Sequence, residues 1–107
     1  MTMGTGTVDR LQSLILLYHE GYQSPTIDQA LVKLIALEVE QARIELQRLE
    51  ARLFAYEQRY ILPSDEFYRR FRAGALGDDR DFVEWSVFWD MSRTTRRRLE
   101  ELTRQMP

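Results

Sequence analysis

The sequence predicts an all-α protein of four helices, organised around one long helix with a heptad repeat. Within residues 25–61, apolar side chains recur alternately three and four positions apart, and no Gly or Pro interrupts the segment after Pro25. Helix-ending residues such as Gly21, Pro63 and Gly74 divide the rest of the chain into shorter helical segments. No segment has the pattern of a strand. We therefore expect a coiled-coil or helical-bundle architecture.

Composition limits the possible classes of protein. A length of 107 residues with 44% hydrophobic residues is typical of one folded domain, and a net charge of −2 provides no general attraction to nucleic acid or anionic lipid. The absence of cysteine excludes disulfides and thiolate metal sites. The first ten residues lack a secretory pattern, and the longest apolar run, residues 14–18, is too short to span a bilayer. We expect a cytoplasmic protein that does not associate with membranes.

The N-terminal part is predicted to be a tail followed by a short helix. Residues 1–6 are rich in Thr and Gly and are expected to be disordered, whereas Thr7 can cap a helix over about residues 8–20. Gly21 is expected to end that helix in a left-handed conformation. A link of about four residues then favours antiparallel packing against the next helix. The first helix is expected to cover Leu31, Leu34 and Leu37.

The remaining helices follow from caps and breakers. Pro63 ends the long helix 25–61, because the residue before a proline disfavours helical geometry. Ser64 is the expected N-cap of a short helix over residues 65–73. A tight Gly-containing connection leads to a last helix over about residues 79–104, which begins with several aspartates that favour a helix N-terminus.

The heptad stripe predicts self-association. Its flanking charges clash in a parallel dimer, where Glu45 meets Glu50, but they are complementary in an antiparallel dimer centred near residues 47–48. The antiparallel pairs would be Glu38–Arg59, Glu45–Arg52 and Arg43–Glu50. We therefore predict an antiparallel homodimer; the alternative is that the last helix folds back along the same stripe. The predicted self-association residues are Val32, Ile35, Val39, Ala42, Leu46, Leu49, Leu53, Tyr56, Glu45 and Arg52, and Tyr60 continues the stripe.

Aromatic residues are concentrated in the C-terminal half, where ten of the twelve lie between Phe54 and Trp89. They can form a second core beneath the short helix. However, the rings of the last helix cover more than one face, so at least one is expected to point outward and anchor a partner protein. Acidic residues beside them can meet a basic surface of that partner. The predicted partner-binding residues are Phe82, Trp85, Phe88, Trp89, Asp78, Asp79 and Asp81.

No group of residues predicts chemistry. The aspartates at the start of the last helix are best explained as helix-capping residues, so we expect no metal site. His19 is the single histidine and is expected at a helix C-terminus. Phosphate-binding glycine loops and nucleophile motifs are absent. We expect no enzymatic activity and no cofactor.

A cluster of arginines lies near the C-terminus. Arg93, Arg97 and Arg104 share one helix face, which would allow contact with nucleic acid. Intrahelical pairs with carboxylates three or four residues away, namely Asp90–Arg93, Arg96–Glu100 and Arg97–Glu101, instead favour a solvated face. Nucleic-acid binding is therefore the alternative function rather than the main one, and a purely structural self-assembling protein is the other.

Several short motifs carry a resemblance to a known class of proteins. They are YEQRY at residues 56–60, SDEFY at 64–68, LGDD at 76–79, and DF and EW at 81–82 and 84–85. Over about residues 50–92 the chain resembles small helical antitoxins, which are encoded beside toxin-like partners in prokaryotes. The resemblance implies a protein that binds and neutralises a toxin. No DNA-binding domain precedes the coiled coil, so the resemblance does not extend to regulation of an operator.

Overall fold

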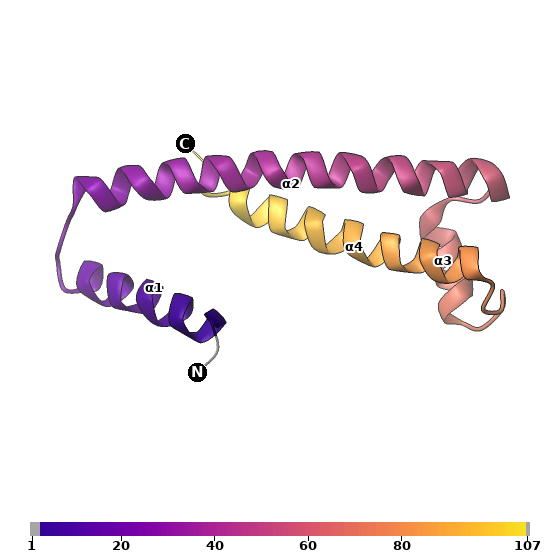
Figure 1. Ribbon diagram of the computed structural model, residues 1–107, viewed down its shortest axis with the longest axis horizontal. Helices are drawn as coiled ribbons and strands as arrows, with labels where there is room; N and C mark the ends of the chain where they lie inside the picture. Colours follow the sequence, from indigo (N-terminus) through magenta and orange to yellow (C-terminus); the bar gives the residue numbers. More distant parts are fainter. Residues whose placement is uncertain (1–2, 107) are drawn as a thin grey trace. The chain divides into compact units, whose positions relative to one another are not determined.

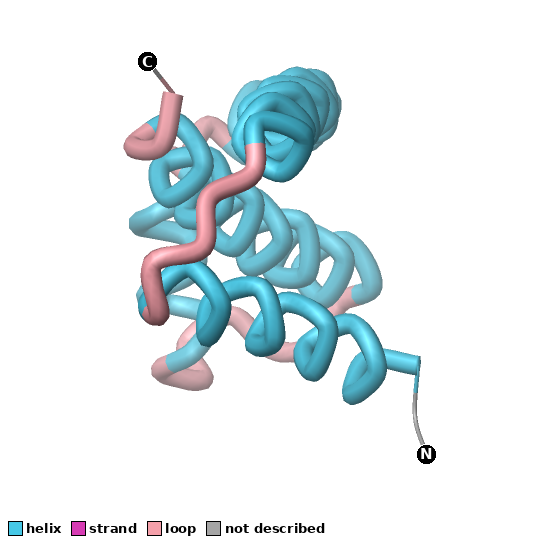
Figure 2. Tube along the Cα trace, turned by 90° about the vertical axis from the view of Figure 1, so that its left-hand side faces the viewer, coloured by secondary structure: helices cyan, strands magenta, loops and turns pink. Residues whose placement is uncertain are grey.

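A computed structural model describes residues 3–106, and it shows an all-helical chain with no strand in that range (Figures 1 and 2). The predicted all-α class is confirmed. The chain divides into two compact units, an N-terminal unit of residues 1–31 and a C-terminal unit of residues 32–107. The helices are α1 (Met3–His19), α2 (Pro25–Tyr60), α3 (Ser64–Arg72) and α4 (Arg80–Thr103), of which α2 runs from one unit into the other.

Three of the four helices begin and end within one residue of the predicted bounds, but α1 begins at Met3 rather than at Val8. Part of the segment predicted as a disordered tail is therefore helical, while Met1 and Thr2 lie outside the described residues. The physical reason is cooperativity. Once a helix has formed, each added residue gains a hydrogen bond without a new nucleation cost, and the first amide groups of any helix need no partner inside it.

In the N-terminal unit, the turn between α1 and α2 is held by its own hydrogen bonds. Gly21 has φ +100°, as predicted, and the amide of Tyr22 donates to the carbonyl of Leu17 at 3.0 Å, which closes a Schellman motif. The hydroxyl of Tyr18 donates to the carboxylate of Asp28 at 2.8 Å and accepts from the amide of Ser24 at 3.2 Å. These bonds connect the end of α1 to the first turn of α2.

In the C-terminal unit, α4 runs antiparallel to the later part of α2 (Figure 1). Ion pairs join Arg98 to Glu45 and, at 3.5 Å, Arg96 to Glu50. Four stripe residues are buried in this unit, with 0–6% exposure: Val39, Ala42, Leu49 and Leu53. The heptad stripe is thus covered within the chain over this length, which is the alternative that the sequence left open.

The coverage within the chain changes how the stripe can be used. The four buried residues cannot form the contact surface of a homodimer while α4 lies over them, whereas Leu46 and Tyr56 are half-buried. The residues of the predicted intermolecular pair also have partners within the chain: Glu45 pairs with Arg98, and the Arg52 guanidinium lies 5.0 Å from the centre of the Phe88 ring. The homodimer itself stays a prediction.

Ile61 ends α2 in a conformation that suits glycine. Its φ is +51°, its side chain is 90% exposed, and the amide of Leu62 donates to the carbonyl of Glu57 at 3.3 Å. A left-handed conformation costs an L-residue roughly 1–2 kcal/mol. We therefore expect Ile61→Gly to raise the free energy of unfolding by about 1 kcal/mol, measured by urea denaturation. Ile61→Ala, which keeps a Cβ, is the control; an equal gain in both variants would contradict this explanation.

Candidate interaction surfaces

Trp85 is the centre of the C-terminal core rather than an anchor for a partner. Its side chain is 0% exposed and stacks on Phe67, with ring centroids 3.7 Å apart and an interplanar angle of 4°. Its indole N–H donates to the hydroxyl of Ser64 at 2.9 Å. This corrects two predictions. Trp85 is inaccessible to a partner, and the Ser64 side chain accepts from Trp85 instead of capping α3, where Pro63 holds the N-cap position.

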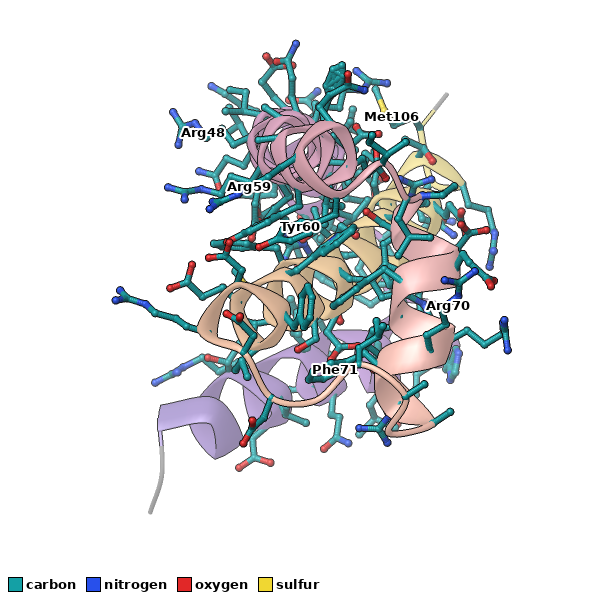
Figure 3. The ribbon with its side chains drawn as sticks, turned by 90° about the vertical axis from the view of Figure 1, so that its right-hand side faces the viewer. Arg48, Arg59, Tyr60, Arg70, Phe71 and Met106 are labelled. Atoms are coloured by element: carbon teal, nitrogen blue, oxygen red, sulfur yellow. The ribbon has the colours of Figure 1, made fainter. Side chains whose placement is uncertain are left out.

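The other rings of the predicted partner site pack around the same core. Phe82 lies edge-on to Tyr60 with centroids 5.2 Å apart, and Trp89 lies 6.3 Å from Tyr68. Phe82, Phe88 and Trp89 are all half-buried. Figure 3 shows the ring of Tyr60 directed toward α4, whereas Arg48 points away from it. The aromatic concentration is thus mainly a core that joins α2, α3 and α4, which was the other interpretation of the sequence.

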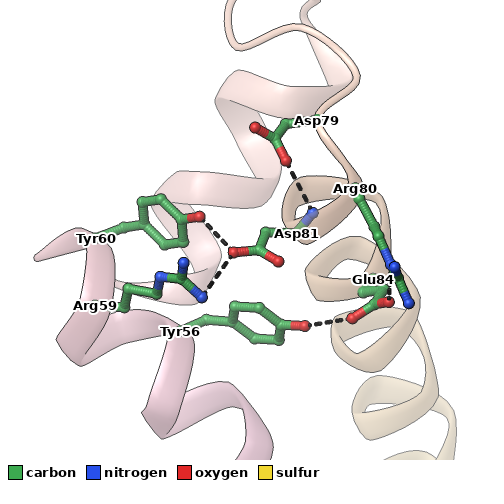
Figure 4. Close-up of polar contacts among 7 residues, drawn as sticks. All are labelled: Tyr56, Arg59, Tyr60, Asp79, Arg80, Asp81 and Glu84. Atoms are coloured by element: carbon green, nitrogen blue, oxygen red, sulfur yellow. Dashed lines mark hydrogen bonds and ion pairs between the residues drawn. The ribbon is translucent and has the colours of Figure 1, made fainter.

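The predicted acidic residues mostly hold α4 in place (Figure 4). Asp81 accepts from the hydroxyl of Tyr60 and pairs with Arg59 at 3.0 Å. The Asp79 carboxylate accepts from the amide of Asp81 at 3.1 Å, which confirms the predicted capping role. Asp78 is exposed. Among residues 3–106, no three carboxylate or histidine side chains are grouped in a way that could hold a metal ion.

Tyrosine–carboxylate hydrogen bonds join α4 to both neighbouring helices. Besides the bond to Asp81, Tyr56 of α2 donates to Glu84 at 2.9 Å, and Tyr68 of α3 donates to Asp90 at 2.9 Å. Burial and the bond to Glu84 raise the pKa of Tyr56 from 10.0 to about 12. The bond from Tyr56, together with one from Arg80, lowers the pKa of Glu84.

The raised pKa of Tyr56 predicts a loss of stability in alkali. A phenol that keeps its proton in the folded state stabilises the fold fully below its unfolded pKa, and this contribution is lost as pH rises from 10 to about 12. We expect the Tyr56→Phe variant to lose less stability over this range than the wild type, measured by urea denaturation at fixed pH steps. Tyr22→Phe, which alters a half-exposed residue of the other unit, is the control. An unchanged alkaline slope in Tyr56→Phe would contradict the assignment.

The exposed apolar residues of α4 lie on its other face. Val83, Val87 and Met91 are 43%, 49% and 42% exposed. They are spaced four residues apart, so they form one row on the helix, opposite the buried face of Trp85 and Ser92. We call these three residues the outer row. Sequence reasoning missed it because the larger rings dominated the pattern; the spacing of Val83, Val87 and Met91 was the available signal.

The arginines of α4 and of its C-cap, Arg104, are divided between paired and unpaired positions. Arg104 pairs with Glu101 at 2.8 Å, and Arg96 pairs across to α2. None of the three expected intrahelical pairs forms, because Asp90 accepts from Tyr68, Glu101 pairs with Arg104 and Arg96 reaches Glu50. In the described part of the chain, Arg93 and Arg97 form no ion pair, and they line an open pocket with Asp90, Thr94, Arg96 and Glu100.

The N-terminal unit contains an apolar groove of about 340 Å³ between α1 and the first turns of α2. We call it the N-terminal groove. No side chain from Gly6 to Leu31 is buried. The groove is lined by Leu11, Leu14, Ile15, Tyr18, His19, Ile27 and Leu31.

Residues that were expected beneath the first helix are exposed. Leu31 is 41% exposed, and in the C-terminal unit Leu34 and Leu37 are 56% and 55% exposed. Leu31 lines the N-terminal groove beside residues of α1 and is only partly covered, whereas the coverage of Leu34 and Leu37 by α1 stays a prediction.

Two further observations concern the whole of the described chain. Between Met3 and Met106, no helix combines the length and the apolar character that crossing a bilayer requires. No protein-family model, curated protein or solved structure matches this sequence.

Proposed function

We propose that this chain is a non-enzymatic helical interaction protein, which binds and neutralises a toxin-like partner protein in the manner of an antitoxin. The resemblance over residues 50–92 supports the class of partner. The observation that carries the proposal is the outer row on α4, because three apolar side chains are exposed on a helix whose opposite face is held by the aromatic core. A rigid helix that presents apolar side chains loses little conformational entropy when it binds.

The chemistry of the outer row defines the partner surface. Side chains at i, i+4 and i+8 are the arrangement with which a helix enters an apolar groove of another protein. Asp78 and Arg80, both exposed near the start of α4, lie outside the row and would meet polar groups at the rim of that groove. Rim charges influence the choice of partner and the rate of association more than they add affinity.

Co-expression with a toxin-like protein encoded beside this gene tests the proposal. We expect the wild type to co-purify with that protein and to relieve its growth inhibition. Val87→Asp places a charge in the outer row and is expected to weaken binding at least tenfold, while Ala51→Asp, at an exposed position of α2, retains it. Retention of both binding and growth rescue in Val87→Asp would contradict the proposed surface.

A second candidate function is contact with nucleic acid through Arg93 and Arg97, since these two side chains form no ion pair in the described part of the chain. Binding through phosphates would weaken as salt rises. We expect Arg93→Gln with Arg97→Gln to abolish any such binding, measured by fluorescence anisotropy with a labelled duplex. No binding of the wild type at low salt would exclude this function.

A further inference from the structure

The N-terminal unit presents an apolar surface that its own residues leave uncovered. None of its side chains from residue 6 onward is buried, although seven large apolar ones are 41–58% exposed. A helix that is apolar on nearly all sides is normally buried. In α1, Leu16 and Leu17 are exposed in addition to the residues that line the N-terminal groove. The seven side chains are Val8, Leu11, Ile15, Leu16, Leu17, Tyr22 and Leu31.

We propose that a second copy of this chain occupies the N-terminal groove, so that α1 and the first turns of α2 from two chains form a four-helix bundle. This contact surface is separate from the outer row, and it differs from the heptad stripe that the sequence predicted as the homodimer contact. Two helix pairs of this kind supply the two layers that one pair lacks, and bundles of four helices bury such surfaces around a common core.

The size of the exposed surface fits a homodimer. The seven side chains together offer on the order of 600 Å² of apolar area per chain. One side of a standard interface buries roughly 800 Å², of which about 65% is apolar in homodimers. A second copy supplies an equal apolar area, so neither chain is left with a large uncovered patch.

The distribution of charge along α1 also fits a second copy. Residues 11–18, LQSLILLY, carry no charged side chain and can be buried without removing a charge from water. Asp9 and Arg10 precede this segment, and His19 and Glu20 follow it. Antiparallel packing of two α1 helices about a twofold axis near Leu14 therefore buries the uncharged centres. It also places Asp9 and Arg10 of one copy near His19 and Glu20 of the other, so the charged residues lie at the two ends of the contact and outside its apolar centre.

Sedimentation equilibrium from 1 to 100 µM measures this association. We expect a dimer for the wild type and an at least 100-fold weaker association for Ile15→Asp, which puts a charge into the groove. Gln23→Asp adds the same charge to the same unit, outside residues 11–18 and outside the groove lining, and is expected to remain dimeric. Because Ile15 is 53% exposed, its substitution should not unfold the chain, and circular dichroism with a second variant, Leu11→Asp, checks this.

Cross-linking locates the axis. The chain has no cysteine, so Leu14→Cys introduces a single thiol near the proposed axis, and we expect it to form a covalent dimer on mild oxidation. Val87→Cys on α4 is the matched control and is expected to form no covalent dimer. Cross-linking of Val87→Cys alone would place the contact elsewhere and overturn the proposal.

Three other results would overturn the proposal that a second copy occupies the N-terminal groove. A wild type that is monomeric at 100 µM excludes a second copy in the groove. If that monomer loses the toxin-like partner on Ile15→Asp, the groove belongs to the partner instead. A dimer that survives both Ile15→Asp and Leu11→Asp is formed by another surface. Partner binding by Val87→Asp is measured by co-purification, whereas the dimer is measured by sedimentation equilibrium. Failure of the proposed function and failure of the dimer are therefore distinguishable.

Discussion

Trp85→Ala is expected to lower the free energy of unfolding by roughly 3–5 kcal/mol, the cost of removing a large buried aromatic side chain. Trp85 is 0% exposed and stacks within 5.7 Å, centroid to centroid, of Phe67, Tyr56 and Tyr60. Its removal leaves a cavity at the point where three helices meet. Because small domains have total stabilities of only about 5–15 kcal/mol, this variant should lie close to the limit of folding.

Urea denaturation followed by far-ultraviolet circular dichroism measures this loss. Trp89→Ala, which removes the same side chain from a half-buried position, is the matched control and should cost clearly less. Ser64→Ala isolates the hydrogen bond: it leaves the indole N–H without its partner and is expected to cost about 1–3 kcal/mol. A Trp85→Ala variant that is as stable as the wild type but fails to bind the partner would restore Trp85 as a binding residue.

Ala42→Leu is expected to destabilise the protein by about 1–3 kcal/mol, because it adds volume to a packed interior. Ala42 is 0% exposed, between the buried residues Val39 and Leu49 on the same stripe. Because protein interiors are closely packed, three extra carbon atoms at this buried position are expected to push α2 and α4 apart or to force side chains out of their preferred rotamers. A homodimer built on an open stripe would instead accept the larger side chain.

The same substitution at an exposed position separates packing from helix propensity. Ala51→Leu lies on α2, where it faces solvent, and leucine is nearly as good a helix former as alanine. We expect its free energy of unfolding, measured by urea denaturation, to stay within about 0.5 kcal/mol of that of the wild type. If Ala42→Leu were equally neutral, the packing of α4 over this part of α2 would be wrong.

The resemblance and the structure direct attention to different residues of α4. The sequence motifs emphasise aspartates and rings, whereas in the structure Trp85 and Asp81 connect α4 to α2 and α3. Such residues act on binding only through the position of α4. Substitutions in the outer row, by contrast, are expected to change binding without changing stability. Measuring both quantities for each variant therefore distinguishes an interaction protein from a purely structural one.

The sequence by itself determined the all-helical class and nearly all helix ends. Gly21, Pro63 and Asp79 act through backbone geometry or local hydrogen bonds, which depend only on neighbouring residues. The start of α1 was missed because helix extension is cooperative and the composition of residues 3–7 opposes it only weakly.

Only the tertiary structure decided which partner each side chain meets. A heptad stripe is satisfied equally by α4 of the same chain or by a second chain, since hydrophobic burial has no preference for either. Ser64 is a good N-cap in isolation, yet its hydroxyl accepts from Trp85, which is 21 positions away in the sequence. The difference is one of range: caps and turns act over three or four residues, whereas burial depends on which segments pack together.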